Sequence, residues 1–329
     1  MNISIVVVVV LALLFDFLNG INDSSNIVAT MISSRAFSPR VALSTTAIAN
    51  FAGPFIFGVA VATTIGHDVV AASAINIEVL IAGLVSAILW NRISWQLGFP
   101  SSSSHALIGG FIGSVIMGAG WKSIMIPGVE KILIALFAGP IVGFIVGFIV
   151  LRILLMLCWD VSPRINQVFK RGQIVTAVAM ALSHGANDAQ KTMGIITLAL
   201  VTVGYLKTFE VPVWVIILCA GMIGLGTAVG GWRLIKTLGG KFYTIRPIHG
   251  ISTQLASTAV MLTASLLGGP VSTSQVVSSA IMGVGAGDRM NKVRWGVAGE
   301  IATAWLLTIP VTAAFGAGLY LLISKVWPL

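Results

Sequence analysis

The chain has 329 residues, of which 57% are hydrophobic and only 9% are charged, and its mean hydropathy is +1.01. Because soluble domains carry about 25% charged residues, this composition excludes a soluble globular protein and predicts an all-α protein that crosses a membrane many times. The net charge of +9 does not indicate nucleic-acid binding, because Lys and Arg fall in short loops between apolar segments.

Apolar segments alternate with short polar loops along the whole chain. Their approximate ranges are 3–18, 24–34, 41–62, 76–95, 103–120, 131–157, 172–186, 189–206, 212–232, 250–269, 273–287 and 295–324. A helix needs about 20 residues to cross the hydrocarbon core, so segments such as 24–34 and 273–287 are too short. We therefore expect about 12 membrane segments, and some of these are predicted to be broken helices or arms of re-entrant hairpins.

The first apolar segment runs into the polar stretch LNGINDSSN, residues 18–26. Gly20 permits a helix break here, as Gly185 does before Asp188. Asn22 and Asp23 then lie at membrane depth, where lipid cannot satisfy their hydrogen bonds. A charged side chain at the bilayer centre costs about 2.5 kcal/mol or more, so Asp23 is a candidate functional carboxylate. The alternative is that Asp23 only caps the half-helix that follows it.

Basic loops indicate how the chain is oriented. Four loops are rich in Lys and Arg: they contain Arg35 and Arg40; Arg164, Lys170 and Arg171; Arg233, Lys236, Lys241 and Arg246; and Arg289, Lys292 and Arg294. Cytoplasmic loops are enriched in Lys and Arg, so these loops are predicted inside, and the loops 64–76 and 205–211 outside. The polar stretch 158–172 is then a cytoplasmic linker between an N-terminal membrane repeat, 1–157, and a C-terminal one, 173–329.

The two halves share two sequence blocks in the same order. The first pair is displaced by 165 positions and the second by 170: Gly20–Asn22–Asp23 with Gly185–Asn187–Asp188, and GFPSSSSHALIGG at 98–110 with GGPVSTSQVVSSAIMG at 268–283. The segment of Asp23 ends at a basic loop and that of Asp188 begins after one, so the repeats are predicted to be inverted. Inverted repeats are typical of secondary transporters, although a channel or a membrane enzyme also fits this pattern.

Hydroxyl groups follow a proline in both copies of the second block. Ser101 to Ser104 follow Pro100, and Ser272, Thr273 and Ser274 follow Pro270. Proline suits the first turn of a helix, where free backbone N–H groups, the helix dipole and hydroxyl donors together favour an anion. We expect the two helix ends to surround a tetrahedral oxyanion; the alternative is ordinary capping or helix packing by small residues.

At these residues the sequence resembles the PiT family of inorganic phosphate transporters. The matching elements are Gly185–Ala186–Asn187–Asp188, Pro100–Ser101–Ser102–Ser103–Ser104–His105 and Pro270–Val271–Ser272–Thr273–Ser274–Gln275. The resemblance covers nearly the whole chain and implies a cation-coupled phosphate symporter of the bacterial low-affinity type, with about twelve membrane segments. The chain departs from the family pattern after Asp23, where the usual small residues are missing, and at Gln275, which replaces a second His.

We therefore expect a secondary transporter and not an enzyme, since the sequence contains no nucleophile–base pair, metal cluster or cofactor motif. The predicted phosphate ligands are Ser102, Ser103, Ser104, Ser272, Thr273, Ser274, Asn22 and Asn187. The predicted ligands of the coupling cation are Asp23, Asp188, Asn22 and Asn187, with Na⁺ placed at Asp23 and Asp188 if Na⁺ is the coupling ion, and the further candidates are Lys191, Gln190, His105 and Gln275.

The expected partners are inorganic phosphate, a coupling cation and the lipid bilayer of the cell membrane. The sequence leaves open whether that cation is Na⁺ or H⁺, because some members with a similar SHGAND-x-QK element are regarded as proton-coupled and others use sodium. Neither a cofactor nor a structural metal is expected, and a homodimer is compatible with this interpretation. Two other functions also stay open: a sulfate permease of the same family, and an uncoupled anion channel.

Overall fold

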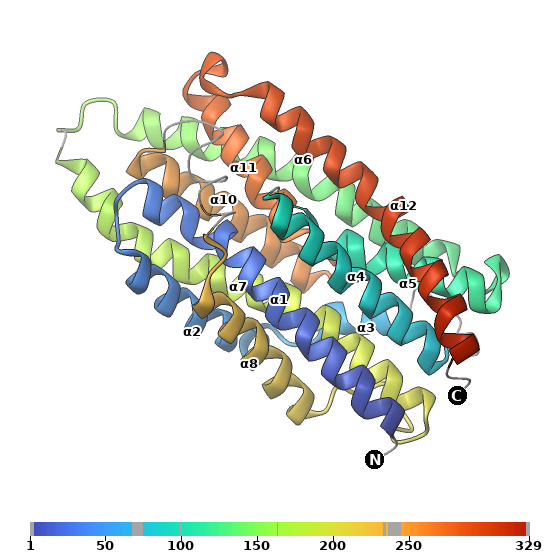
Figure 1. Cartoon of the computed structure of the whole chain (residues 1–329). Helices are drawn as coiled ribbons and strands as arrows, with labels where there is room; N and C mark the ends of the chain where they lie inside the picture. Colours follow the sequence, from blue (N-terminus) through green and yellow to red (C-terminus); the bar gives the residue numbers. More distant parts are fainter. Residues whose placement is uncertain are drawn as a thin grey trace.

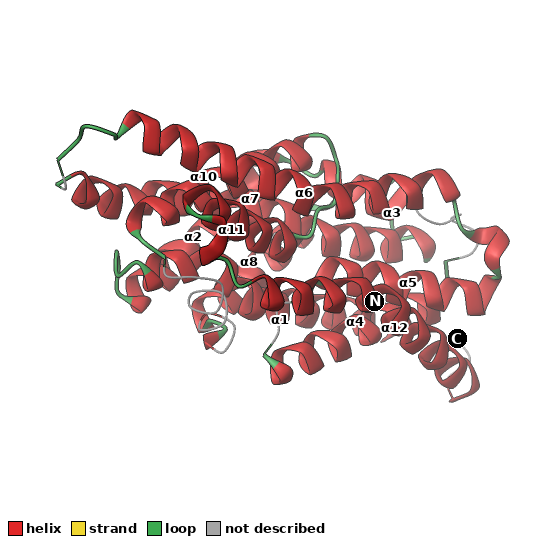
Figure 2. Ribbon diagram, turned by 90° about the horizontal axis from the view of Figure 1, so that it is seen from above, coloured by secondary structure: helices red, strands yellow, loops and turns green. Residues whose placement is uncertain are grey.

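The computed structural model describes residues 3–67, 75–98, 101–162, 164–232, 235 and 245–326. Within these residues all regular secondary structure is helical (Figure 2). The helices are α1 (Ile3–Ser33), α2 (Pro39–Phe57), α3 (Ala60–His67), α4 (Ile77–Leu97), α5 (Ser103–Ala119), α6 (Ile126–Leu157), α7 (Ile165–Thr202), α8 (Val213–Val229), α10 (Pro247–Leu266), α11 (Thr273–Asp288) and α12 (Trp295–Val326). The prediction of an all-α membrane protein is confirmed for this part of the chain.

Four of the described helices are long and apolar enough to cross a membrane: α1, α4, α6 and α12. Helices α2 and α3 are bent by 78° at a break that contains Gly58, whose φ of 77° suits glycine, and together they would make a fifth span. Helices α5 and α8 are apolar but have only 17 residues each. By length and composition the described residues thus contain four or five full spans, and about twelve segments stay a prediction.

Helices α1 and α7 run without interruption through the predicted breaks. Gly20 and Asp23 lie inside α1, and Gly185 and Asp188 lie inside α7. The predicted break at each glycine is therefore wrong, as is the alternative that each aspartate caps a half-helix. The glycines allow close packing instead, since a Cβ added at Gly185 would lie 2.8 Å from the Cα of Asn50 in α2, and one at Gly20 would meet α8 similarly.

Helices of each half of the chain pack on helices of the other half. Helix α2 packs on α7 and α8 on α1, while α5 packs on α12 and α11 on α6. Figure 1 shows α1 and α7 running along the length of the bundle. Most residues of α7 from Ser183 to Leu200 are buried, as are those of α1 from Asp23 to Met31. The parts of α1 and α7 that carry the first repeated block therefore lie inside the molecule.

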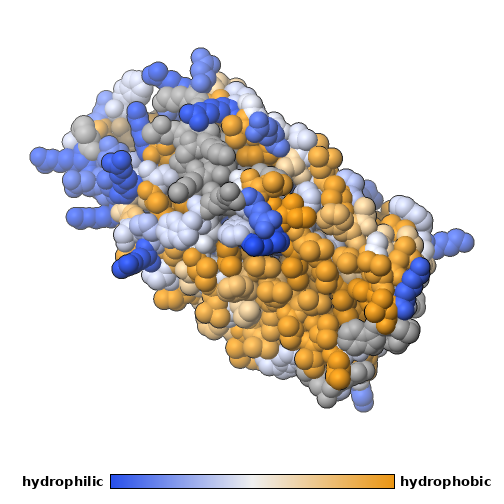
Figure 3. All heavy atoms as spheres, viewed as in Figure 1, coloured by the Kyte–Doolittle hydropathy of each residue, from blue (hydrophilic) through white to orange (hydrophobic). Residues whose placement is uncertain are grey.

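The two ends of the bundle differ in polarity. The connections α1–α2, α6–α7 and α11–α12 lie towards one end, and both termini lie at the other (Figure 1). Figure 3 shows hydrophilic residues gathered at the first end and a broad hydrophobic band beyond it. Helix α7 begins at Ile165, so the described non-helical linker is shorter than the predicted stretch 158–172. The predicted loop residues Asp68, Arg233, Lys236 and Lys241 lie outside the described residues, as does the side chain of Lys292.

Candidate functional site

A stripe of buried polar side chains runs along α1. Asp16, Asn19, Asp23 and Asn26 follow one another at intervals of three or four residues, and each is at most 3% exposed. Residues at these intervals share one face of a helix. The stripe faces α7, because Asp16 Oδ1 accepts a 2.6 Å hydrogen bond from Thr192 Oγ1. An apolar helix thus presents a continuous polar edge to the centre of the bundle.

Asp23 is held by side chains from three helices. Its Oδ1 accepts hydrogen bonds from Ser274 Oγ on α11 at 2.7 Å and from Asn26 Nδ2 on α1 at 2.6 Å. Its Oδ2 lies 3.3 Å from Thr273 Oγ1 and 3.6 Å from Nε2 of His184 on α7. The first block of the N-terminal half therefore meets the second block of the C-terminal half at this carboxylate.

Asp188 has the same kind of surroundings. Its Oδ2 accepts hydrogen bonds from Thr273 Oγ1 at 3.0 Å and Asn19 Nδ2 at 3.2 Å, and lies 3.3 Å from His184 Nε2. Thr273 and His184 thus stand between the two carboxylates. One ligand atom each from Asp23, His184 and Asp188 lies within 4.8 Å of the others, so this group can hold a cation.

Lys191 completes the cluster on the other side of Asp188. Its ammonium group forms an ion pair with Asp188 Oδ1 and is only 2% exposed. It also donates hydrogen bonds to Ser104 Oγ on α5 at 2.7 Å and to the carbonyl oxygen of Val271 at 2.9 Å. A buried charge is tolerated when it is paired and hydrogen-bonded, and both conditions hold for this lysine.

The N-terminal ends of α5 and α11 meet, as the repeated serine blocks predicted. Ser102 and Ser272 are the N-caps, and their hydroxyls accept from the backbone N–H groups of His105 and Gln275. Gln275 Nε2 lies 3.3 Å from His105 Nδ1, so the last residues of the two motifs touch across 170 positions. Ser103, Ser104, Thr273 and Ser274 are all buried in the first turns of these helices.

Proline does not occupy the helix start that was predicted for it. Pro270 precedes the N-cap Ser272 by two positions and lies outside the first turn of α11, so the hydroxyl and not the proline begins the helix. Pro100 lies outside the described residues.

Three other residues that were predicted to belong to the site do not contact the two aspartates in the way that Thr273 and Lys191 do. Asn187 Nδ2 donates to Ser265 Oγ at 3.0 Å and to the carbonyl oxygen of Gly269, and thereby holds the segment before α11. Gln190 Oε1 accepts from the N–H group of Val61 at 2.7 Å, at the start of α3. Asn22 is half-buried and borders two small cavities. The structure therefore does not bring the side chains of Asn187 and Gln190 to the aspartates.

Sequence reasoning did not assign Asp16, Asn19, Asn26 or His184 to the site. The spacing of three or four residues along α1, within an otherwise apolar run, is the signal that would have identified the first three. His184 lies one turn before Asp188 on the same face of α7, and the same rule applies to it. No spacing in the sequence predicts which of these residues bonds to which.

Two small cavities adjoin the cluster. One, of about 10 Å³, is lined by Asn22, Asp23, Ser25, Asn26, Ser94, Ser101 and Ser274. It holds about one water molecule, so an ion the size of phosphate enters only if the helices separate. The other, of about 70 Å³, is lined by Asn22, Arg92 and Trp95 among others, and the Arg92 guanidinium lies 4.7 Å from the centre of the Trp95 ring. Asn22 borders both cavities.

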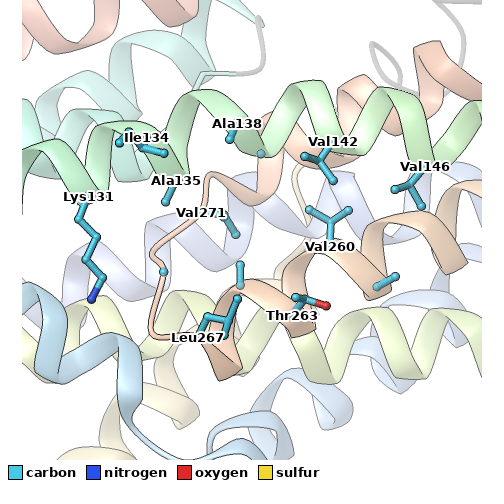
Figure 4. Close-up of a pocket in the computed structure, with 14 residues that line it drawn as sticks. Lys131, Ile134, Ala135, Ala138, Val142, Val146, Val260, Thr263, Leu267 and Val271 are labelled. Atoms are coloured by element: carbon cyan, nitrogen blue, oxygen red, sulfur yellow. The ribbon is translucent and has the colours of Figure 1, made fainter.

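A larger groove, of about 480 Å³, lies between α6 and α10 and has a different character (Figure 4). Apart from Lys131 and Thr263, its lining residues are apolar or glycine. Ile134 and Val142 on α6 are exposed there, as is Leu267 directly after α10. Such an apolar lining is typical of a surface that contacts lipid or another protein, and it does not suit polar chemistry.

Comparison with known proteins assigns the chain to a family. The model of the "Phosphate transporter family" matches residues 19–164 and 158–316. A "Probable low-affinity inorganic phosphate transporter" of Bacillus subtilis (strain 168) is 42% identical over 326 residues, which cover 98% of each chain. A protein of the same name from Rhizobium meliloti (strain 1021) is 40% identical over 314 residues, 95% of this chain and 94% of its own.

A solved structure has the same fold. "The sodium-dependent phosphate transporter" superposes with a TM-score of 0.89 and covers 98% of this chain and 99% of its own, at 24% sequence identity. The relatives are named as transporters, so the chain is a membrane transport protein and not an enzyme. The buried aspartates and hydroxyls described above are thus the polar centre of a protein that belongs to the phosphate transporter family.

Proposed function

We propose that the chain is a secondary active transporter, which carries inorganic phosphate across the cell membrane together with a cation by alternating access. The observation that carries this proposal is that Asp23 and Asp188 accept hydrogen bonds from hydroxyls of α11. Asp188 is also linked through Lys191 to Ser104 of α5. The names of the relatives support phosphate as the substrate. The name of the structural neighbour, a sodium-dependent transporter, supports a coupling cation, and the proposal covers both Na⁺ and H⁺ in that role.

The charges in the cluster explain why a cation would be required. Lys191 offsets the charge of Asp188, so Asp23 is left as an uncompensated carboxylate. Two unit charges about 4 Å apart interact by roughly 4 kcal/mol at an effective dielectric constant of 20, so this carboxylate would repel an anion strongly. A cation held between Asp23, His184 and Asp188 would offset that repulsion. Because each ligand would then raise the affinity for the other, cation and phosphate would bind together. This mutual dependence is the physical basis of symport.

The hydroxyls fall into two groups with different roles. Ser102 and Ser272 are engaged as N-caps, and we assign them the role of fixing the two helix ends. The predicted phosphate ligands that are not engaged as N-caps are Ser103, Ser104, Thr273, Ser274 and Asn22. To bind an anion, the hydroxyls of Ser104, Thr273 and Ser274 would exchange their present hydrogen bonds within the cluster. Asn187 would act indirectly, by holding the segment before α11.

The repeat supplies a route to alternating access. The repeated blocks and the exchange of packing partners, α2 on α7 and α8 on α1, support two inverted halves, 1–157 and 173–329, with a cytoplasmic linker between them. The cavity beside Asp23 is too small for phosphate, so the halves would have to move apart for loading. The cavity that Arg92 lines and the cavity beside Asp23 both border Asn22. The Arg92 cavity would then be the part of the phosphate path that lies farther from Asp23. A homodimer stays a prediction.

Phosphate uptake into proteoliposomes tests the proposal. Purified protein is reconstituted, and radiolabelled phosphate uptake is measured under a Na⁺ gradient or a proton gradient, each imposed alone. We expect the phosphate concentration inside the vesicles to rise above the external concentration under at least one gradient. Protein-free vesicles are expected to take up no phosphate. Uptake that only equilibrates under every gradient would instead identify an uncoupled channel. Stronger competition by sulfate than by arsenate would identify a sulfate permease.

A further inference from the structure

Lys191 lies inside a cage of three oxygen atoms. These atoms are Oδ1 of Asp188, Oγ of Ser104 and the carbonyl oxygen of Val271. They come from three parts of the chain: α7, α5 and the segment between α10 and α11. Ser104 Oγ also lies 3.2 Å from the carbonyl oxygen of Val271, so two of the cage atoms touch each other.

The number of oxygens in the cage equals the number of N–H donors of the ammonium group, and the one carboxylate balances its charge. A lysine ammonium has three N–H donors and no acceptor, and three oxygens receive them. The side chain is 2% exposed, so these contacts replace the water that a free ammonium would bind. Every donor of Lys191 is therefore used within the protein.

The same three oxygens are the ligand types of a hard metal cation. Carboxylate, hydroxyl and backbone carbonyl oxygens coordinate such ions in proteins, and one carboxylate charge suits a monovalent ion. A lysine ammonium is a compact point charge of +1. It can therefore take the place of a monovalent metal ion without changing the charge of the site.

We propose that this cage is a monovalent-cation site that the chain fills with its own Lys191, so that phosphate uptake needs no Na⁺ at this position. The inference rests on the proposed function. A tethered ammonium stays with the protein through the whole transport cycle, so it adds no energy from an ion gradient. Lys191 therefore supplies fixed charge compensation for Asp188, and the driving cation acts at the neighbouring group of Asp23 and His184.

Removal of the ammonium provides the test. Lys191→Ala leaves the three oxygens and one buried carboxylate charge without a cation, and the matched control is Lys122→Ala, in the exposed turn Trp121–Ser123. Melting temperatures of purified proteins are measured in NaCl and in choline chloride at equal ionic strength. Since a ligand that binds only the folded state stabilises it, NaCl is expected to raise the melting temperature of Lys191→Ala more than that of wild type or Lys122→Ala. In the double variant Lys191→Ala/Ser104→Ala the Na⁺ effect is expected to shrink, because one cage oxygen is lost.

Uptake measurements give a second readout. Phosphate uptake under a fixed proton gradient is measured in Na⁺ and in choline, and the ratio of the two rates is compared between wild type and Lys191→Ala. This ratio is expected to be at least about tenfold larger for Lys191→Ala, because an uncompensated buried charge costs well above the 1.4 kcal/mol of a tenfold change. Lys191→Gln, which places an amide among the same oxygens, serves as the second variant if Lys191→Ala does not fold.

Each outcome decides the inference. A folded Lys191 variant whose uptake and melting temperature respond to Na⁺ no more than those of wild type overturns it. If neither variant folds, equal wild-type uptake in Na⁺ and choline supports the inference. If the wild type takes up no phosphate under any gradient, the proposed function fails, while the melting experiment still decides whether the cage binds Na⁺.

Discussion

Ser274 on α11 donates a 2.7 Å hydrogen bond to the carboxylate of Asp23 on α1, although 251 positions separate the two residues. The equivalent residue of the other serine block, Ser104, bonds to Lys191, which is paired with Asp188. Each aspartate is thus connected to the hydroxyl block of the opposite half. Movement of one half relative to the other would break these contacts, so the contacts link the site to the conformation of the bundle.

Replacement of either aspartate by Asn is expected to abolish concentrative phosphate uptake. Both variants remove a carboxylate that accepts several buried hydrogen bonds and faces His184. They should differ in stability, because Asp188→Asn also leaves Lys191 without its partner, and breaking a buried ion pair costs about 3–5 kcal/mol. Uptake and melting temperature are measured together, with Glu130→Gln on the exposed face of α6 as the control. Wild-type uptake in both aspartate variants would reject their role in coupling.

Thr273→Ala and Ser103→Ala are each expected to weaken phosphate binding. A hydrogen bond to a charged group is worth about 1.5–3 kcal/mol and a neutral one about 0.5–1.5 kcal/mol. Thr273 should have the larger effect, because its hydroxyl also lies between the two carboxylates. The effects of the double variant are not expected to add, since both residues would act on one ligand.

Single cysteines at positions 103 and 273 provide an independent check of the shared site. Bound phosphate is expected to protect both from a small thiol reagent, and the variants are made in a background without Cys158 and Cys219. Protection of only one position, or of neither, would show that the two helix ends do not share a ligand.

Arsenate is expected to compete with phosphate more strongly than sulfate does. Arsenate has the same tetrahedral shape and the same protonation pattern, whereas sulfate carries no proton near neutral pH. The buried carboxylate and hydroxyl acceptors around Asp23 can receive a hydrogen bond from a protonated oxyanion. Uptake of labelled phosphate is measured with each anion in excess. The reverse order of competition would favour a sulfate permease.

Arg92→Ala is expected to raise the phosphate concentration needed for half-maximal uptake without abolishing transport. Its guanidinium borders the cavity that shares Asn22 with the cavity of Asp23, so the substitution removes a positive charge from the path to the site. Arg152→Ala is the matched control, because Arg152 also stacks on an aromatic ring, that of Phe148, but lies on α6. Equal effects of both substitutions would remove Arg92 from the path.

Gly185→Ala is expected to destabilise the protein, while Gly221→Ala is not. A Cβ at position 185 would press into the backbone of Asn50, whereas one at position 221 would meet no atom within 4 Å. Overpacking costs about 1–3 kcal/mol, and an exposed helical Gly→Ala change gains up to about 1 kcal/mol. Melting temperatures in detergent compare the two. A stable Gly185→Ala protein would contradict the close contact between α2 and α7.

Much of the architecture follows from the sequence itself. Long apolar runs have to be helical in lipid, where every backbone N–H and C=O group needs an internal partner, so the all-α membrane class could be predicted. The repeated blocks were visible because the same residue types recur at nearly the same offset. Asp23, Asp188 and the serine blocks stood out for the same reason, as costly polar groups in apolar surroundings.

Tertiary structure alone decided how these residues meet. The sequence could not show that α1 and α7 continue through Gly20 and Gly185, because glycine permits both a helix break and the close approach of another helix. Nor could it show that Lys191 is enclosed by oxygens from α5, α7 and the segment before α11. Such a cage depends on contacts across 80 positions or more, and the free energy of a buried charge is set by the atoms that surround it, not by its neighbours in the chain.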